Sequence, residues 1–180
     1  LQPNVGVVEV PDARIDRLVE IFHPKKTIYT TFEFTDIAGL VKGASKGEGL
    51  GNQFLSNIRL TDAICHVVRC FDDANITHVE NSVDPVRDAE IINLELNLAD
   101  LQTVENRIGK IEKKSKTTKD KDAVAEMALL NRLKPLLEEG KPARVLEVDE
   151  DEAIILKGYN LLTAKPMIYV ANLDEEGVMD

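Results

Sequence analysis

The sequence predicts an α/β fold with a mostly parallel sheet, interrupted by a long helical insertion. Two observations support this fold class. In residues 1–84 and again in residues 143–180, short apolar runs typical of buried strands alternate with amphipathic stretches typical of helices. Between these two parts, residues 85–142 keep apolar side chains at spacings of three and four, which is the period of a helix surface.

The first predicted elements are a strand, a helix and a second strand. Residues 5–10 form an apolar strand-like run, and Asp12 then stands where it can cap a helix with an apolar stripe. Residues 27–35 form the next strand, which carries Asp36 at its carboxyl end.

A glycine-rich stretch separates this strand from the next helix. Residues 43–51 (GASKGEGLG) predict a conformationally soft loop, because glycine adopts backbone conformations that other residues avoid. Residues 52–60 then predict a helix. Residues 63–71 are a continuous apolar run, as expected for a strand covered on both faces, and residues 72–84 predict a loop.

In the insertion, the sequence pattern predicts two amphipathic helices joined by a polar turn. One apolar stripe covers residues 91–111 and a second covers residues 124–137, with a polar break at residues 115–120. Gly140 then ends the second helix. We expect an antiparallel helical hairpin, a coiled coil in which the two stripes bury each other; the alternative is that a stripe serves as a partner site.

The last part returns to the α/β pattern. Asp149 stands where it can cap a helix over residues 150–162, and the carboxylates of its first turn favour the positive end of the helix dipole. Residues 166–171 predict a short buried strand that ends at Asn172.

The composition is that of a globular domain with an acidic balance. It is 43% hydrophobic and 30% charged. The formal net charge of −10 argues against nucleic-acid binding over the whole surface, and we expect no DNA partner. No apolar run approaches the roughly 20 residues that span a bilayer, and no signal peptide is evident, so we expect a cytoplasmic protein without membrane contact.

One motif lies at the end of the second predicted strand. Asp36, Ile37, Ala38 and Gly39 match D-x-x-G, in which P-loop NTPases hold a magnesium-bound water and contact the γ-phosphate. The glycine N–H has to approach the phosphate without a side chain in the way. The pattern is short, but its place at a strand end before a soft loop favours this interpretation.

A second motif follows the last predicted strand. Residues 172–175 have the pattern N-x-x-E, where guanine-specific GTPases have N-K-x-D. Leu173 lacks the lysine stem that packs along the base, and Glu175 is one methylene longer than aspartate. Displacing that carboxylate should cost on the order of a few kcal/mol of guanine preference. The alternative is an ordinary strand-to-helix turn with Asn172 as a cap.

Together these motifs resemble the YchF or Obg-like ATPases, a branch of the Obg-related P-loop NTPases. The resemblance covers essentially all 180 residues, and its most specific block is 36–53, DIAGLVKGASKGEGLGNQ. Residues 4–8, 11–12, 65–71 and 169–175 also carry it. It implies a Rossmann-like P-loop NTPase core.

The resemblance also implies a division of the chain. Residues 1–84 would be the central part of the nucleotide-binding domain, residues 85–142 the helical hairpin, and residues 143–180 the return to that domain. No G-x-x-x-x-G-K-[ST] occurs in the sequence. We therefore expect a fragment, with the phosphate-binding loop upstream and a small β-rich TGS domain downstream, that is inactive in isolation.

The implied chemistry is magnesium-dependent hydrolysis of ATP in preference to GTP. Asp36 would hold Mg²⁺ through a water and the Gly39 N–H would meet the γ-phosphate. Asn172, Leu173 and Glu175 would lie near the base. The remaining expected residues form a switch loop: Leu40, Lys42, Gly43, Lys46, Gly47, Gly49 and Gly51.

Leu40 stands where many GTPases have the glutamine that orients the attacking water. An apolar side chain cannot hydrogen-bond that water, so we expect slow turnover. Lys42, Lys46 and Glu48 are candidates for a replacement contact; the alternative is that they are solvated switch residues.

The resemblance implies association with ribosomes, and the turn of the insertion is rich in lysine. Lys113, Lys114 and Lys116 are candidates for contact with RNA or another acidic partner; the alternative is a solvated turn. No aromatic residue interleaves these lysines, so phosphate contact would dominate. Two other hypotheses remain: a GTPase with relaxed base selectivity, and a ribosome- or protein-binding module in which hydrolysis is secondary.

Overall fold

The computed structural model describes residues 4–37, 50–73, 75–76, 78, 82–117, 120–175 and 177–178, without the side chains of residues 50–53, 113 and 115–117. The chain divides into two compact units, Leu1–Gly39 and Leu40–Asp180. No helix among the described residues is both long and apolar enough to cross a bilayer.

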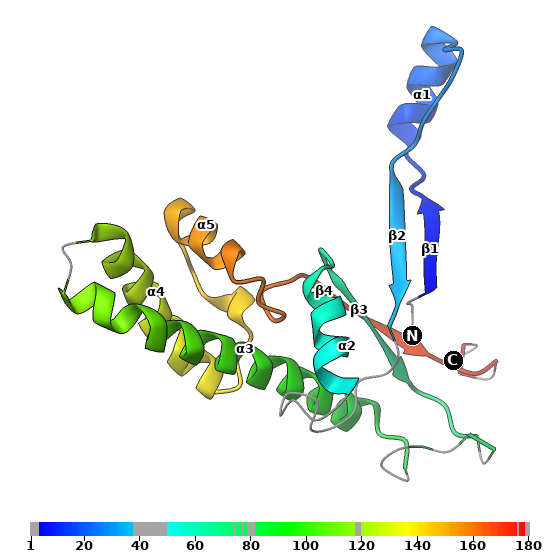
Figure 1. Ribbon diagram of the computed structural model, residues 1–180. Coiled ribbons are helices and arrows are strands. Elements are labelled where there is room, and N and C mark those ends of the chain that lie inside the picture. The colour runs from blue at the N-terminus through cyan, green and yellow to red at the C-terminus, as the bar shows by residue number, and fades with distance from the viewer. Residues whose placement is uncertain are drawn as a thin grey trace. The chain divides into compact units, whose positions relative to one another are not determined.

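The first unit consists of β1 (Asn4–Glu9), α1 (Ala13–Phe22) and β2 (Thr31–Asp36) (Figure 1). The predicted cap of α1 is confirmed, since the Asp12 side chain accepts a hydrogen bond from Arg14 N at 2.9 Å. β2 begins later than predicted. No described residue of this unit is buried.

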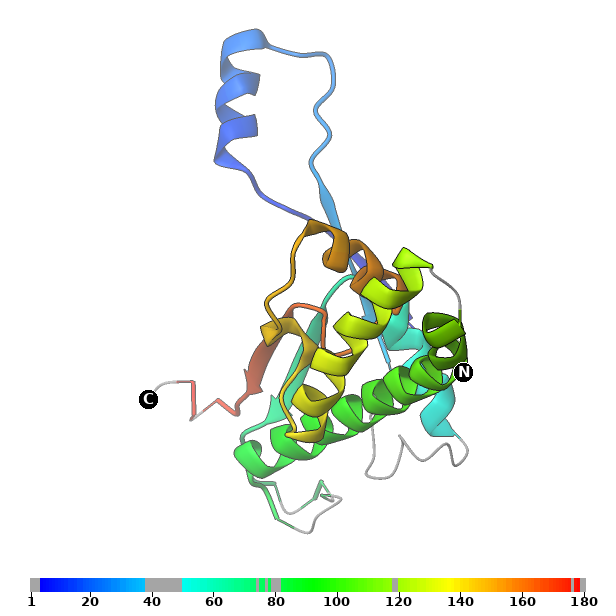
Figure 2. The ribbon, with the colours of Figure 1, turned by 90° about the vertical axis from the view of Figure 1, so that its left-hand side faces the viewer.

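The two strands of the first unit do not form a parallel pair. β1 and β2 are antiparallel, with Asn4 opposite Asp36. A parallel pair needs a helix that crosses back over the face of the sheet. α1 lies beyond the ends of the two strands instead, so the chain turns around and returns alongside β1 (Figures 1 and 2).

The sheet of the second unit is parallel but small. β3 (Ile64–Arg69) pairs with β4 (Met167–Asn172), with Arg69 opposite Asn172. The predicted mostly parallel sheet is therefore wrong for the described residues, which form one antiparallel and one parallel two-stranded sheet. β3 is also not covered on both faces: Val68 is buried, but Val67 is 59% exposed.

Helices make up most of the second unit. They are α2 (Leu50–Arg59), α3 (Pro85–Thr117), α4 (Lys121–Glu138) and α5 (Glu150–Gly158), with a short 3-10 helix, η2 (Ala143–Val145). α3 continues into the predicted polar break. α4 begins at its N-cap Asp120, contains Pro135, and is followed by Gly140 at a φ of 76°.

α3 and α4 pack side by side in opposite directions (Figure 2). Ion pairs between them join Glu105 to Lys134 and Lys114 to Asp120, so residues near the end of α3 meet the start of α4. The coiled coil stays a prediction, and part of the first apolar stripe faces outward, since Leu94 is 54% exposed.

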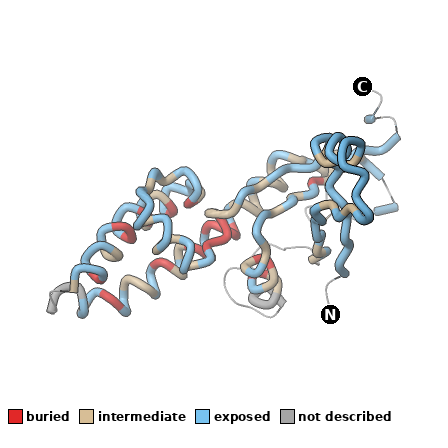
Figure 3. Tube along the Cα trace, turned by 90° about the horizontal axis from the view of Figure 1, so that it is seen from above, coloured by how far each residue is buried: buried red, intermediate tan, exposed pale blue. Residues whose placement is uncertain are grey.

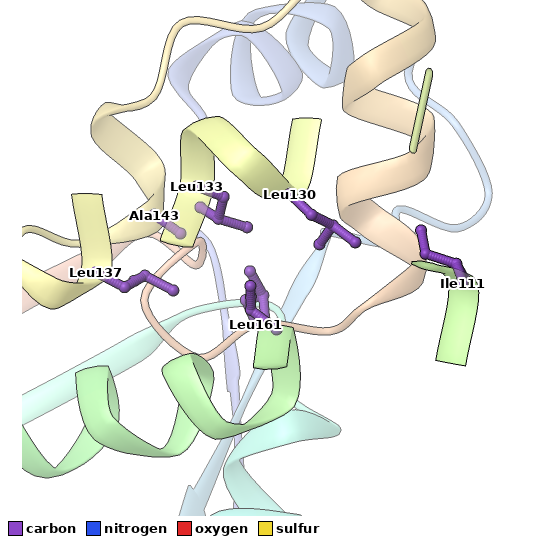
Figure 4. Packing of buried hydrophobic residues seen from close by; sticks show 7 residues of the cluster. Ile111, Leu130, Leu133, Leu137, Ala143 and Leu161 are labelled. Carbon is purple, nitrogen blue, oxygen red and sulfur yellow. The ribbon is translucent and has the colours of Figure 1, made fainter. Parts of the chain in front are cut away.

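The core of the second unit lies between α3, α4 and the chain around them. In Figure 3 the buried positions lie in this unit. Figure 4 shows side chains of α4 gathered around Leu161. The cluster consists of Val104, Ile111, Leu130, Leu133, Leu137, Ala143 and Leu161.

α5 has the predicted start and a different end. Asp149 and Glu152 form a reciprocal capping box. The helix stops at Gly158 instead of continuing to residue 162, because Leu161 and Leu162 are buried in the core and the chain has to leave the helix to place them there.

Candidate functional site

Asp36 is the last residue of β2, and its side chain is exposed. Its place at a strand end is as predicted. One exposed carboxylate fits an outer contact to Mg²⁺, which usually keeps several of its waters. Among the described residues, no group of three or more His, Cys, Asp or Glu side chains gathers into a metal site.

Most of the predicted switch loop lies outside the described residues. Gly51 falls within the first turn of α2. The candidate residues that lie outside the described residues are Gly39, Leu40, Lys42, Gly43, Lys46, Gly47, Glu48 and Gly49. The side chains of Lys113 and Lys116 are also outside the description.

The predicted base contacts follow the carboxyl end of β4. Asn172 is the final residue of the strand, and its carbonyl accepts a hydrogen bond from Cys70 N at 2.8 Å. Asn172 and Glu175 are exposed, and Leu173 is 40% exposed. Ligands of open α/β sheets bind at the carboxyl ends of parallel strands, which is where these side chains lie.

A turn fixes the residues after Asn172. Asp174 Oδ1 accepts a hydrogen bond from Gly177 N at 2.8 Å. A Cβ atom at Gly177 would lie 3.1 Å from that oxygen, so the turn favours glycine there. The side chain that closes this turn is thus Asp174. An ordinary strand-to-helix turn, the alternative to a base contact, would have Asn172 as its cap.

Arg69, opposite Asn172, holds the chain that follows β3. Its Nε donates to Phe71 O at 3.0 Å and its Nη1 donates to Ile76 O at 3.1 Å. The guanidinium also lies 4.7 Å from the centroid of the Phe71 ring. The sequence does not indicate this role, because its signal there is a single arginine near the end of an apolar strand.

β4 is also tied to the helical part of the unit. Asn93 of α3 donates through Nδ2 to the Tyr169 hydroxyl at 2.8 Å. This contact helps to place the strand that ends at Asn172.

Lys114, a predicted partner contact, already has an intramolecular partner. Its Nζ lies 2.8 Å from Asp120 Oδ2, and this hydrogen bond raises the pKa of Lys114. Asp120 is also the N-cap of α4. Lys114 therefore helps to join the two helices at the turn, a role that the sequence did not indicate.

Known proteins match this chain over nearly its whole length, and a family model matches part of it. Residues 16–104 match a family model described as 50S ribosome-binding GTPase. The ribosome-binding ATPase YchF of Bacillus subtilis is 59% identical over 100% of this chain and 49% of its own length. The protein of the same name from Escherichia coli O157:H7 is 54% identical over 98% of this chain and 48% of its own length.

A solved structure extends the likeness to three dimensions. The YchF GTPase of Schizosaccharomyces pombe is 40% identical, with a TM-score of 0.81, over 99% of this chain and 49% of that chain. This supports a P-loop GTPase fold. The chain spans about half the length of the curated relatives that it matches.

Proposed function

Because the chain belongs to the YchF family, we propose that its protein is a nucleotide-dependent switch that binds ATP and slowly hydrolyses it in preference to GTP. The names of the relatives do not agree on the preferred nucleotide, since the bacterial proteins are named ATPases and the S. pombe protein is named a GTPase. The residues after β4 bear on this choice.

The observation that carries the ATP preference is the N-x-x-E sequence at the exposed end of β4. Guanine recognition requires a carboxylate placed for two hydrogen bonds to one edge of the base. Glu175 is longer than the aspartate of N-K-x-D, and Leu173 brings no lysine stem to the base. Adenine makes no such demand on a carboxylate, and we place it near Asn172 and the Leu173 backbone.

Asp36 is the proposed contact to Mg²⁺, held through a water. When bound, the ion neutralises charge on the phosphates. Asp36→Asn should then abolish most hydrolysis by the intact protein. Glu33→Gln is the matched control, since Glu33 is an exposed carboxylate on the same strand. Equal effects of the two changes would count against a special role for Asp36.

The base preference is tested by hydrolysis of ATP and GTP by the intact protein under matched conditions. We expect a higher kcat/KM for ATP; a higher value for GTP would overturn the proposal. Leu173→Lys with Glu175→Asp restores N-K-x-D and should shift selectivity toward GTP on the order of tenfold, or about 1.4 kcal/mol. Leu173→Met keeps an apolar stem and should leave selectivity unchanged.

We also expect the 180-residue chain alone to hydrolyse neither nucleotide. A phosphate-binding loop supplies much of the nucleotide affinity of P-loop NTPases, and no G-x-x-x-x-G-K-[ST] occurs among these residues. Tight nucleotide binding by the chain alone, measured by calorimetry, would contradict this expectation.

The proposed partner is the ribosome, in the cytoplasm. The names of the relatives support this proposal, and so do the lysines near the end of α3, Lys113, Lys114 and Lys116. A second candidate function is a ribosome-binding module in which hydrolysis is secondary. Co-sedimentation of the intact Asp36→Asn variant with ribosomes distinguishes the switch from the binding module. Binding that is equal with ATP, with ADP and without nucleotide would favour the module.

A further inference from the structure

A buried carboxylate on α3 lies outside every motif discussed above. The Asp100 side chain is 0% exposed. Its Oδ1 accepts a hydrogen bond from Leu162 N at 2.8 Å, and its Oδ2 accepts two from Thr163, from N and Oγ1, each at 2.7 Å. Asp100 therefore holds the segment that leads into β4, whose far end is Asn172.

Arg59 brings α2 to the same place. It is the last residue of α2, and its Nη1 lies 3.6 Å from Asp100 Oδ1. Nη1 also donates to Asn160 O at 3.0 Å, and Nη2 donates to Thr103 Oγ1 at 3.2 Å. One guanidinium thus contacts both α3 and the segment before β4.

A second cation holds the same end of α2. Lys165 Nζ donates to Arg59 O at 3.1 Å and to Thr61 O. These carbonyls lie at the end of α2, where unpaired carbonyls and the helix dipole favour a positive charge. α2 is therefore tied at its carboxyl end to the residues that precede β4.

The contact between α2 and α3 is partly polar. Leu55 and Ile58 of α2 are buried, but a cavity of about 380 Å³ opens beside them. It is lined by Leu55, Ser56, Arg59, Ala99, Gln102, Thr103 and Asn106. On this side, the specific contacts of Arg59 hold the helices in register in place of continuous apolar packing.

Asp100 keeps several donors around it despite its burial. Burial raises the pKa of Asp100, while the hydrogen bonds from Thr163 and Leu162 and the charge of Arg59 act in the opposite direction. Movement of α2 would draw Arg59 away from a carboxylate that has no contact with water. An uncompensated buried charge is costly, so Arg59 and Asp100 should respond together.

We propose that Arg59 and Asp100 couple α2 to α3 and to residues 160–165, so that nucleotide-dependent movement of α2 reaches the long helix and the strand that ends at Asn172. The inference rests on the proposed function, because α2 directly follows the glycine-rich stretch that we assign to the nucleotide switch. Arg59 and Asp100 are positioning residues in this scheme. The position of α2 is the property that the nucleotide on one side, and α3 with residues 160–165 on the other, both influence.

Hydrogen exchange of the intact protein, with and without ATP and Mg²⁺, tests the coupling. In the unaltered protein we expect nucleotide to change exchange in α2, in residues 96–106 and in residues 159–165. In Arg59→Ala the change in α2 should persist, while the change in the other two segments falls at least threefold. The matched control is Arg132→Ala, which breaks an ion pair to Glu152 elsewhere in the unit and should keep all three responses.

The outcomes separate this inference from the proposed function. No response to nucleotide in any segment of the unaltered protein would overturn both. A response confined to α2, or an Arg59→Ala variant with full responses in all segments, would overturn only the coupling. If Arg59→Ala does not fold, Thr103→Val removes one contact of Arg59 and decides the question: it should reduce the response in residues 96–106, and an unchanged response there would reject the coupling.

Discussion

Arg107 on α3 and Glu126 on α4 form an ion pair with two hydrogen bonds, from Nε to Oε1 at 2.5 Å and from Nη2 to Oε2 at 2.8 Å. The Tyr159 hydroxyl, just beyond α5, also donates to Glu126 Oε1 at 2.5 Å. Glu126 is the more buried partner, with 15% of its side chain exposed against 42% for Arg107. One carboxylate therefore joins three parts of the second unit.

Replacing this carboxylate should destabilise the chain. Glu126→Gln removes the charge that Arg107 pairs with while keeping the shape of the side chain. We expect the free energy of unfolding to fall by about 1–2 kcal/mol, since charge-assisted hydrogen bonds with partly buried partners are stronger than surface pairs. Urea unfolding followed by circular dichroism measures this.

Glu138→Gln provides the matched control for that change. Glu138 pairs with Lys134 at 3.6 Å on the exposed surface of α4. A pair four residues apart on a helix contributes roughly 0.3–0.5 kcal/mol, so this variant should stay within about 0.5 kcal/mol of the unaltered chain. Equal losses in the two variants would show that Glu126 makes no special contribution.

The same pair predicts a dependence of stability on pH. The hydrogen bond from Arg107 is the main cause that lowers the pKa of Glu126 from its ordinary 4.5. Because the folded pKa lies below the unfolded one, the carboxylate stabilises the fold above pH 4.5, and this contribution is lost as the pH falls toward the lowered value. Melting temperatures of Glu126→Gln should therefore fall less steeply below pH 4.5 than those of the unaltered chain.

The prediction is rejected if the melting temperatures of the two proteins fall in parallel as the pH is lowered. Other carboxylates contribute to the acid limb in both proteins, so only the difference between the two curves reports Glu126. That difference should be largest near neutral pH and shrink with acidification.

A backbone prediction concerns the end of α4. Gly140 has a φ of 76°, in the left-handed region that side chains disfavour. Gly140→Ala should therefore lower the free energy of unfolding by about 1 kcal/mol, although a Cβ atom there would meet nothing within 4 Å. Thermal unfolding measures the loss.

Gly158 offers the opposite case at the end of α5. It lies within the helix, and a Cβ atom there would also meet nothing within 4 Å. Gly158→Ala should be neutral or stabilise by up to roughly 1 kcal/mol, because alanine is the better helix former. A Gly158→Ala variant that loses as much stability as Gly140→Ala would show that the positive φ of Gly140 is not the cause of its loss.

Local features of the chain could be predicted from the sequence because their causes lie within a few residues. Asp12 and Asp149 cap helices through bonds to residues two and three positions ahead. The strand ends at Asp36 and Asn172 follow from apolar runs that stop at polar residues. Asp36 is the starting point of the proposal for Mg²⁺, and Asn172 is the starting point of the proposal for the base.

Other features depend on contacts between distant residues and could not be predicted. Asp100 meets Leu162 and Thr163 across 62 and 63 positions, and its partners there include two backbone N–H groups, which any residue would supply. The direction of the β1–β2 pair depends on where α1 lies, which periodicity does not indicate. Long-range packing also ends α5 early, because Leu161 belongs in the core.

The lysines near the end of α3 give the last prediction, which tests ribosome contact. Lys113→Glu with Lys116→Glu reverses two charges and leaves the Lys114–Asp120 ion pair and the cap of α4 in place. Phosphate contacts release counterions, so the loss of two should weaken binding of the intact protein to ribosomes, on the order of tenfold, and flatten its dependence on salt. Co-sedimentation at several salt concentrations measures both.

The matched control is Lys25→Glu with Lys26→Glu, which makes the same change in net charge outside this group of lysines. If binding depends on overall charge alone, both variants weaken it equally, because long-range attraction follows net charge. If these lysines contact RNA phosphates directly, only the first variant loses affinity and salt dependence. Unchanged co-sedimentation of the Lys113 and Lys116 variant would leave these lysines as solvated residues at the end of α3.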